Sequence, residues 1–312
     1  MPTVLITGGT GMIGKALTKV LLEKNYKIII LSRGDKSITD NQQFTDSGLQ
    51  YARWDIKQQS IDEDAIAKAD YIIHLAGAGV ADKRWSEKRK AEIVSSRVDS
   101  GRLLVDSLKN IRNQVKAVIS SSAIGWYGAD PVIPNPTPFK EDDPFDKEFL
   151  GLTCKRWEQS IEPVTQLGKR LVKLRTGIVL SKSGGALVEF KKPLMFQVAA
   201  ILGTGKQIIS WIHIDDVVKL FIAAIENENM NGVYNAVAPN PVSNKELTVQ
   251  LAKIKKGNFF VPVHVPSFVL KLMLGEMSIE VLKSATVSSK KIEQTGFAFQ
   301  FSSIEQALKD LV

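Results

Sequence analysis

The sequence predicts an α/β protein with a Rossmann-like, doubly wound parallel sheet and a smaller, mostly helical C-terminal lobe. Three observations predict this fold class. Short apolar, β-branched runs alternate with helical stretches over the first 180 residues. A glycine-rich turn directly follows the first of these runs. After Arg175 the alternation weakens, and glycine pairs and short helical segments replace it.

Six runs in the first part of the chain are predicted to be strands. Several are apolar at consecutive positions, which is typical of parallel strands that are covered on both faces. The predicted strands are Val4–Thr7, Lys27–Ser32, Leu49–Trp54, Tyr71–His74, Val115–Ser121 and Arg170–Arg175.

Helices are predicted between these strands. One follows the glycine-rich turn over Lys15–Lys24. The clearest runs from about Ser86 to Leu108, because apolar residues from Val94 onward recur there at helical spacing. A polar start and a charged first turn favour a helix that begins at Ser86.

The pattern also predicts how the chain is divided. We expect residues 1–180 to form a dinucleotide-binding domain, to which residues 210–240 return through a helix at Asp215–Ile225 and a strand at Gly232–Ala236. Residues 181–209 and 241–312 then form the C-terminal lobe, with short helices and one apolar extended piece, Phe259–Val265.

Composition excludes several classes of protein. With 312 residues, 44% of them hydrophobic and 24% charged, the chain can bury a core. No apolar run approaches the roughly 18 residues of a membrane span, and no signal peptide is visible, so we expect a cytoplasmic protein with no membrane partner. A single cysteine, Cys154, excludes an internal disulfide. Three scattered histidines supply no metal-ligand spacing, so we expect no metal.

Charge is distributed unevenly along the chain. Residues 1–150 hold 21 Lys/Arg and 20 Asp/Glu, a net of +1, so the remainder holds 20 and 13, a net of +7. This basic excess could attract an anionic ligand or surface. Its lysines are scattered, with no run longer than Lys255-Lys256 or Lys290-Lys291. We therefore expect a small-molecule substrate and no nucleic acid.

The glycine-rich turn, Thr7–Gly14, is the most informative stretch. Its glycines at 8, 11 and 14 suit, in order, a tight turn, a close approach of backbone to a pyrophosphate, and packing of the next helix on the sheet. The helix that follows directs its free N–H groups at the phosphates. The cofactor-binding residues predicted here are Gly8, Thr10, Gly11, Met12, Ile13 and Gly14.

The end of the second strand bears on which nicotinamide coenzyme is preferred. An acidic residue there would bind the ribose 2′-hydroxyl, but the strand ends in Ser32-Arg33-Gly34. Arg33 offers a charged fork suited to a phosphate, which favours NADP(H). Asp35 lies nearby and could bind the ribose instead, so NAD(H) stays open.

Three motifs together carry a family resemblance. Thr7–Gly14, the run His74–Ala78 and the run Ser120–Gly128 resemble the extended short-chain dehydrogenase/reductases. Within that superfamily the chain resembles the NAD-dependent epimerase/dehydratase-like proteins that carry a C-terminal domain of unknown function, DUF1731. Further similar runs are Arg84-Trp85, Lys90–Arg97, Trp157-Glu158, Gly184-Gly185, Gly203–Gln207, Ser210–Asp216 and Gly296-Phe297.

The resemblance also shows where this chain departs from its superfamily. Catalysis there relies on a Ser or Thr, a Tyr, and a Lys four residues after the Tyr, whose charge lowers the phenol pKa. Ser122 matches the Ser/Thr position just past the fifth predicted strand. Alignment on Glu158, however, places Leu150 and Cys154 where the Tyr and Lys belong.

Three interpretations of this departure stay open. Tyr127 could supply the phenol as a second catalytic residue beside Ser122, with Lys155 as its cation, or it could pack against Trp126 as a loop anchor. Hydride transfer could instead proceed with water or another side chain as the acid. In the third interpretation, the protein binds a dinucleotide and catalyses nothing.

The resemblance implies further contacts to the cofactor. Leu75, Ala76 and Gly77 follow the fourth predicted strand, and Arg175 and Gly177 would lie near the nicotinamide. Arg175 could clamp an anion or pair with an acid such as Glu158. Asp55 resembles a position that contacts adenine, or it could cap a helix or face solvent.

The second part of the chain supplies the candidate substrate residues. Lys191, Lys192, Phe196 and Trp211 could line the pocket of an anionic or planar substrate. In the run Trp211–Asp216, we expect Asp215 to cap the following helix, and His213 to be a hydrogen-bonded structural residue.

These observations predict an NADP(H)-binding oxidoreductase or epimerase-like protein that acts on a small, sugar-nucleotide-like substrate without the usual Tyr-x-x-x-Lys pair. The alternative is a non-catalytic dinucleotide-binding regulator or sensor. A homodimer is one of the assembly states left open.

Overall fold

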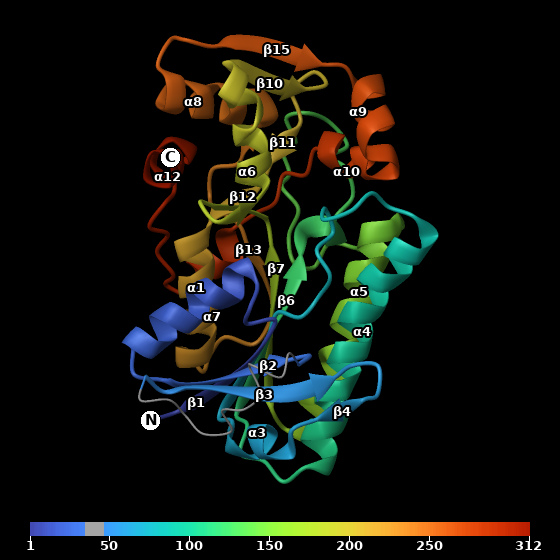
Figure 1. The fold of residues 1–312 in the computed structure, drawn as a ribbon, viewed down its shortest axis with the longest axis vertical. Coiled ribbons are helices and arrows are strands. Elements are labelled where there is room, and N and C mark those ends of the chain that lie inside the picture. The colour runs from blue at the N-terminus through green and yellow to red at the C-terminus, as the bar shows by residue number, and fades with distance from the viewer. Residues whose placement is uncertain (35–46) are drawn as a thin grey trace.

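A computed structural model describes residues 1–34 and 47–312 of the chain, so Asp35 lies outside the described residues. Figure 1 shows a twisted sheet with helices on both faces and a smaller lobe at one end. The predicted doubly wound α/β fold is confirmed.

The main sheet has eight strands in the order β13-β7-β6-β5-β1-β2-β3-β4. All paired neighbours run parallel except β4, which is antiparallel to β3. The chain order reverses between β1 and β5, which is where open α/β sheets bind ligands. The strands are β1 (Thr3–Thr7), β2 (Lys27–Ser32), β3 (Leu49–Asp55), β4 (Ser60–Ile61), β5 (Tyr71–His74), β6 (Ala117–Ala123), β7 (Arg170–Thr176) and β13 (Gly232–Ala236).

The six predicted strands are confirmed, with one shift that bears on the site. β6 begins and ends two residues later than predicted, at Ala117 and Ala123. Ser122 therefore lies within the strand, paired in register with Arg175 of β7, and does not follow the strand as expected.

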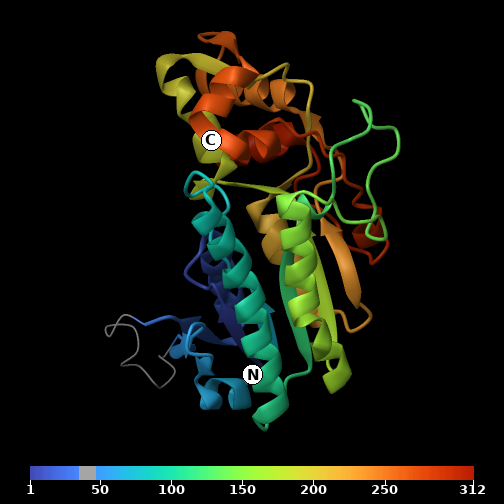
Figure 2. The ribbon, with the colours of Figure 1, turned by 90° about the vertical axis from the view of Figure 1, so that its right-hand side faces the viewer.

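Helices cover the two faces of the sheet (Figures 1 and 2). On one face lie α1 (Met12–Glu23) and α7 (Ile214–Glu226), and on the other lie α3 (Glu63–Lys68), α4 (Glu87–Asn110) and α5 (Phe149–Ile161). An apolar core lies on each face of the sheet. Successive side chains of β1 point into alternate cores: Val4 and Ile6 pack into one, and Leu5 packs into the other. As predicted, Ser86 caps α4, accepting a hydrogen bond from the Arg89 amide.

The C-terminal lobe combines short helices with three small sheets. β12 (Trp211–His213), β8 (Ile178–Ser181) and β9 (Gly184–Gly185) form one, β10 (Val198–Leu202) pairs with β15 (Val261–Val265), and β11 (Ile208–Ile209) pairs with β14 (Val242–Ser243). The helices are α6 (Ala186–Lys191), α8 (Asn244–Lys256), α9 (Ser267–Leu274), α10 (Ser278–Leu282) and α12 (Ile304–Leu311). The short helix α11 (Lys290–Glu293) instead packs against β13, where Ile292 joins the core of the main sheet. The described residues also include four 3₁₀ turns: η1 (Ile124–Trp126), η2 (Glu162–Leu167), η3 (Pro193–Phe196) and η4 (Gly275–Met277).

The start of α7 attaches the C-terminal segment to the sheet. His213, and not Asp215 as predicted, is the N-cap residue, and its Nδ1 accepts a hydrogen bond from the Asp215 amide. The buried carboxylate of Asp216 accepts hydrogen bonds from the amides of Gln300 and Phe301, at 2.8 and 3.0 Å. The described ranges contain no helix with the length and apolarity needed to cross a bilayer.

Candidate functional site

The turn between β1 and α1 requires glycine for steric reasons. Gly8 has a φ of +69°, and a Cβ there would lie 2.9 Å from the Leu75 carbonyl carbon. A Cβ at Gly14 would lie 2.5 Å from the Gly8 oxygen. The first and third glycines therefore bring the turn, the helix and the chain after β5 close together.

The N-terminus of α1 lies open at this turn. Gly11 precedes the helix in an extended conformation, and among the described residues no side chain caps it and no acid occupies the first turn. The first helical hydrogen bond runs from the Lys15 amide to the Gly11 oxygen, which leaves the amides of Met12 to Gly14 outside the helical ladder. Thr10 and Gly11 are exposed beside them. This arrangement is suited to a phosphate group.

A buried hydrogen-bond chain fixes the adjoining strand end at the switch point. The Thr7 hydroxyl accepts hydrogen bonds from the Leu75 and Ala76 amides, at 3.1 and 3.2 Å. Its own hydrogen is therefore available for His74 Nδ1, 2.8 Å away, and the ring proton lies on Nε2, 3.4 Å from the Ser100 hydroxyl. Burial, together with the charge of Arg97, lowers the pKa of His74 to about 4.

Buried arginines hold the segment after β5. A Cβ at Gly77 would lie 3.1 Å from Arg97 Cζ, and Arg97 donates a hydrogen bond to the Ala78 oxygen at 3.0 Å. Arg89 similarly donates to the Gly79 oxygen. The predicted residues Leu75, Ala76 and Gly77 thus lie beside the glycine turn and are held there from behind by α4.

Arg33 lies exposed at the end of β2, where a 2′-phosphate was predicted. A second cation that sequence reasoning missed lies nearby: Arg53 pairs in register with Ser32, and its Nε would be 3.9 Å from a Cβ at Gly34. The hydrogen bond and charge of Arg89 lower the pKa of Glu92 most. The charges of Lys83 and then Arg33 lower it further, so both lie within electrostatic reach of Glu92. These contacts place several basic groups around the end of β2.

Asp55 ends β3, and one of its carboxylate oxygens is used locally. Oδ1 accepts hydrogen bonds from the amides of Lys57 and Gln58, at 2.8 and 3.1 Å. Asp55 Oδ1 therefore caps a turn and not a helix, and the predicted adenine contact stays a prediction.

Ser122, Glu158 and Arg175 form a buried cluster at the carboxyl end of β6 and β7. The Ser122 hydroxyl donates to Glu158 Oε1 at 2.7 Å. Arg175 binds the same carboxylate with Nε at 2.8 Å and Nη2 at 3.0 Å. Of the two roles considered for Arg175, the pairing with Glu158 is confirmed. The hydrogen of Ser122 is committed to a carboxylate that a guanidinium already neutralises.

Tyr127 extends the same cluster and is fully buried. Its hydroxyl donates to Asn235 Oδ1 at 2.7 Å and accepts from Arg175 Nη1 at 3.1 Å. Burial raises the pKa of Tyr127 to about 12, although Arg175 opposes the shift. Its ring stacks on Phe139, and Trp126 packs against the same apolar cluster, in keeping with the anchor alternative.

The cation that contacts Tyr127 is Arg175, and not Lys155 as predicted. Lys155 directs its Nζ at the Phe145 ring, 4.0 Å from the centroid, while Arg175 is the cation that contacts the phenol. The prediction that Lys155 serves Tyr127 is therefore wrong, because α5 carries Lys155 toward Phe145.

Apolar side chains fill the place of the usual Tyr and Lys. A Cβ at Gly125 would lie 3.3 Å from Leu150 Cβ and 3.6 Å from Cys154 Sγ. Burial, and secondly the charge of Glu158, raise the pKa of Cys154 to about 12. Cys154 therefore stays a neutral thiol at physiological pH.

The four predicted substrate residues do not line one pocket, and one of them, Lys192, forms an exposed ion pair with Glu189. Lys191 donates to the Leu311 oxygen at 2.8 Å, and Phe196 is 80% exposed. Trp211 is fully buried in the lobe core, and its Nε1 donates to the Asn240 oxygen at 3.0 Å. The prediction that Trp211 lines a pocket is wrong, because the ring has no exposed surface.

Gly177 has a packing role, since a Cβ there would lie 2.5 Å from the Ser210 oxygen.

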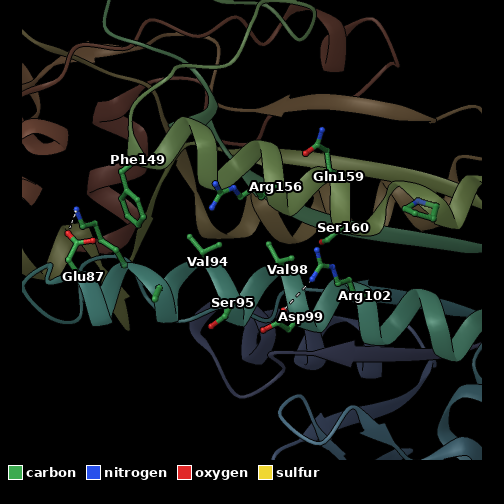
Figure 3. Close-up of a pocket in the computed structure, with 13 residues that line it drawn as sticks. Glu87, Val94, Ser95, Val98, Asp99, Arg102, Phe149, Arg156, Gln159 and Ser160 are labelled. Atoms are coloured by element: carbon green, nitrogen blue, oxygen red, sulfur yellow. Dashed lines mark ion pairs between the residues drawn. The ribbon is translucent and has the colours of Figure 1, made fainter.

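A groove of about 850 Å³ lies on the outer side of α4 and α5, away from the glycine turn (Figure 3). Its lining includes Val94 and Val98 of α4 and Phe149 and Arg156 of α5. It holds none of the predicted cofactor or substrate residues.

His213, Asp215 and Asp310 lie close enough together to resemble a metal site, with their ligand atoms within 4.8 Å of one another. Because His213 Nδ1 accepts a backbone hydrogen bond, the proton of the neutral ring lies on Nε2, which faces Asp310 Oδ2 at 3.3 Å. The neutral ring in this arrangement offers no free lone pair to a metal.

Comparison with known proteins decides the family. The family model described as the NAD dependent epimerase/dehydratase family matches residues 4–149, and the one for DUF1731 matches residues 265–311. Epimerase family protein YfhF of Bacillus subtilis is 34% identical over 310 residues, which are 99% of this chain and 97% of that protein. The chain belongs to the NAD dependent epimerase/dehydratase family. The family expected from the sequence motifs is confirmed.

Other members of this epimerase/dehydratase family extend the similarity. Epimerase family protein SSP1921 of Staphylococcus saprophyticus is 35% identical over the full length of both chains. Among solved structures, human epimerase family protein SDR39U1, crystallised with NADPH, aligns with a TM-score of 0.85 and 26% identity over 99% of this chain and 98% of that chain. A nucleoside-diphosphate sugar epimerase from Corynebacterium glutamicum aligns with a TM-score of 0.76 and 28% identity over all of this chain and 58% of that one.

Proposed function

We propose that this epimerase/dehydratase family member binds NADP(H) and acts as an oxidoreductase or epimerase on a small, sugar-nucleotide-like substrate. One observation carries the proposal: the uncapped N-terminus of α1 opens onto the switch point beside a turn that only glycine permits. A diphosphate-bridged coenzyme fits this combination of free amides and positive helix end.

Two observations support NADP(H) over NAD(H). Arg33 and Arg53 lie at the end of β2 and β3, where the adenosine ribose would bind. The human relative SDR39U1 was crystallised with NADPH. The name of the Corynebacterium glutamicum relative, a nucleoside-diphosphate sugar epimerase, supports the proposed substrate class.

A nicotinamide coenzyme supplies hydride transfer, so the residues of this chain must hold the reactants and move the proton. Ser122 donates its hydrogen to Glu158, and the Tyr127 hydroxyl is buried between Asn235 and Arg175. Both hydroxyls thus position the carboxyl ends of β6 and β7, and we assign them no proton transfer. Water or another side chain would then donate the proton to the substrate.

The hydroxyls of Ser122 and Tyr127 are already hydrogen-bonded within the protein, and this favours a second candidate function. A protein that binds the coenzyme and turns nothing over needs no acid beside the nicotinamide. Such a regulator or sensor would keep the glycine turn and lose the Tyr-x-x-x-Lys pair, as this chain has done.

A hydride-exchange experiment separates the two functions. Protein loaded with C4-deuterated NADPH is incubated with simple carbonyl compounds, and protein loaded with NADP+, the oxidant that an epimerisation needs for its first step, is incubated with nucleotide sugars. The products are analysed by mass spectrometry and chromatography. Product analysis is needed because an epimerisation regenerates its coenzyme. Deuterium in a product, or an epimerised sugar, supports the enzyme. Tight NADPH binding with neither product across the panel supports the sensor.

A further inference from the structure

β15 and α9 lie in the part of the C-terminal lobe drawn at the top of Figure 1. These elements carry large hydrophobic side chains that are exposed. Phe268 and Leu272 of α9 are 73% and 76% exposed. Phe196, Phe259, Val261 and Met273 are also exposed. Large apolar side chains that are exposed together at one end of a lobe indicate a candidate interaction site.

These side chains come from three neighbouring elements. The Val261 amide donates to the Gln197 oxygen at 2.8 Å, which places the start of β15 beside Phe196. α9 begins two residues after β15 ends, and its Phe268 and Leu272 are spaced to share one helix face. We call residues 195–196, 259–263 and 268–273 the apolar end.

Unpaired positive charge adjoins the apolar end. Residues 247–275 contain four lysines (253, 255, 256 and 271) and no Asp or Glu. Lys253, Lys255 and Lys256 lie in the last turn of α8, just before Phe259, and Lys271 lies on α9. Within the described part of the chain these four form no ion pair. Burial is the main cause that lowers the pKa of Lys191, and the charges of Lys255 and Lys182 add to the shift, so Lys255 lies within electrostatic reach of Lys191.

The edge of β15 does not suit a strand from a partner. β15 pairs only with β10 among the described strands, and the Val261 amide points toward β10. Pro262, the next residue, therefore lies on the outer edge, where it offers no N–H. A partner that adds a strand would lose a hydrogen bond at the middle of this short edge.

A second copy of the chain is also a poor occupant. In a two-fold contact the same patch lies on both subunits, so the lysines of α8 and α9 would face their own copies. Like charges at such a contact repel each other. Charge complementarity requires an anionic partner that also accepts apolar side chains.

We propose that the apolar end binds the surface of an anionic lipid bilayer. The phenyl and aliphatic side chains would enter the headgroup region, and the lysines of α8 and α9 would contact anionic headgroups. The sequence predicted no membrane partner because it has no spanning segment, but a surface contact needs none. This site is separate from the proposed coenzyme site at the glycine-rich turn, Thr7–Gly14.

Vesicle flotation with the full chain tests the proposal. Sealed vesicles of phosphatidylcholine alone are compared with vesicles that contain about one third phosphatidylglycerol, a composition rich in anionic lipid. We expect the protein to float with the anionic vesicles and not with the neutral ones, and high salt to release it.

Two paired variants locate the contact. Lys255→Glu/Lys256→Glu and Phe268→Ser/Leu272→Ser should each reduce binding about tenfold or more. Lys109→Glu/Arg112→Glu, at the end of α4 at the opposite end of the molecule, should leave it unchanged. Coenzyme affinity should be the same in all of them, which separates this test from that of the proposed function.

Three outcomes would overturn the proposal. The first is no flotation with anionic vesicles, and the second is flotation that neither paired variant weakens. The third is a concentration-dependent dimer, without flotation, that Phe268→Ser/Leu272→Ser abolishes, since this would assign the surface to a second copy.

Discussion

Arg175 and Glu158 form a side-on ion pair through two hydrogen bonds of 2.8 and 3.0 Å, with both side chains buried. The pair joins β7 to α5, and it connects Ser122 on one side to Tyr127 on the other. Removal of one partner from a buried pair leaves an uncompensated charge, whereas removal of both can be nearly neutral.

The Glu158–Arg175 pair should therefore behave as a unit in stability measurements. Glu158→Gln should lower the free energy of unfolding by about 3 kcal/mol, because the Arg175 charge stays buried without its counter-ion. The double variant Glu158→Leu/Arg175→Met should recover most of that loss. Urea unfolding measures both. A double variant that loses the sum of the two single effects would contradict this expectation, because additive losses would show that the two side chains stabilise the fold independently.

His74 should make stability depend on pH in the acidic range. The folded pKa of about 4 lies below the unfolded value near 6.5, so between these values the unfolded chain binds the proton more readily. The contribution is complete above pH 6.5 and falls by about 3 kcal/mol as the pH drops to 4. Urea unfolding of wild type and His74→Gln across this range measures the difference in slope. Equal slopes would contradict the buried neutral state of His74.

Tyr127→Phe distinguishes a structural from a catalytic hydroxyl. Loss of the hydroxyl removes the donor to the buried Asn235 Oδ1 and one of the hydrogen bonds of Arg175, which should cost about 1–3 kcal/mol of stability. Coenzyme affinity, and any turnover found in the hydride-exchange assay, should stay unchanged. Thermal unfolding and that assay, run on the same samples, give the two readings. Lost turnover with unchanged stability would restore Tyr127 as a catalytic residue.

Arg33→Ala should weaken NADPH far more than NADH. A lost charged hydrogen bond to the 2′-phosphate is worth roughly 1.5–3 kcal/mol, and NADH has no such phosphate. Arg112→Ala, which removes the same charge just past the end of α4, is the matched control. Fluorescence titration gives both affinities. If Arg33→Ala weakens both coenzymes equally, Arg33 does not read the phosphate.

The main sheet could be predicted because its signal is local. Val4, Leu5 and Ile6 are all buried, since helices cover both faces, and this produces a continuous apolar run that sequence alone reveals. The strands of the lobe have two to five residues and exist through their partners, as Trp211–His213 does beside Ile178–Ser181. No periodicity can develop over so few residues.

The parts of the candidate site that could be predicted are likewise those that depend on local sequence. The glycine turn was predictable because steric rules for backbone act within a few residues. The cluster around Glu158 depends on the register that aligns Ser122, Arg175 and Asn235 across β6, β7 and β13, which sequence does not state. The acid-free stretch from 247 to 275 was visible in the sequence, but the exposure of Phe268 and Leu272 was not.

Calorimetric titration of wild type and Gly11→Ala with NADPH and NADH tests the central claim most directly. A Cβ at Gly11 would meet only the Gly8 oxygen, at 3.3 Å, and its φ is ordinary, so the variant should fold normally. The added methyl group would stand where the pyrophosphate must approach. We predict that wild type binds NADPH more tightly than NADH and that Gly11→Ala weakens both. No binding heat with either coenzyme, or equal binding by a folded Gly11→Ala variant, would contradict a coenzyme cradle at this turn.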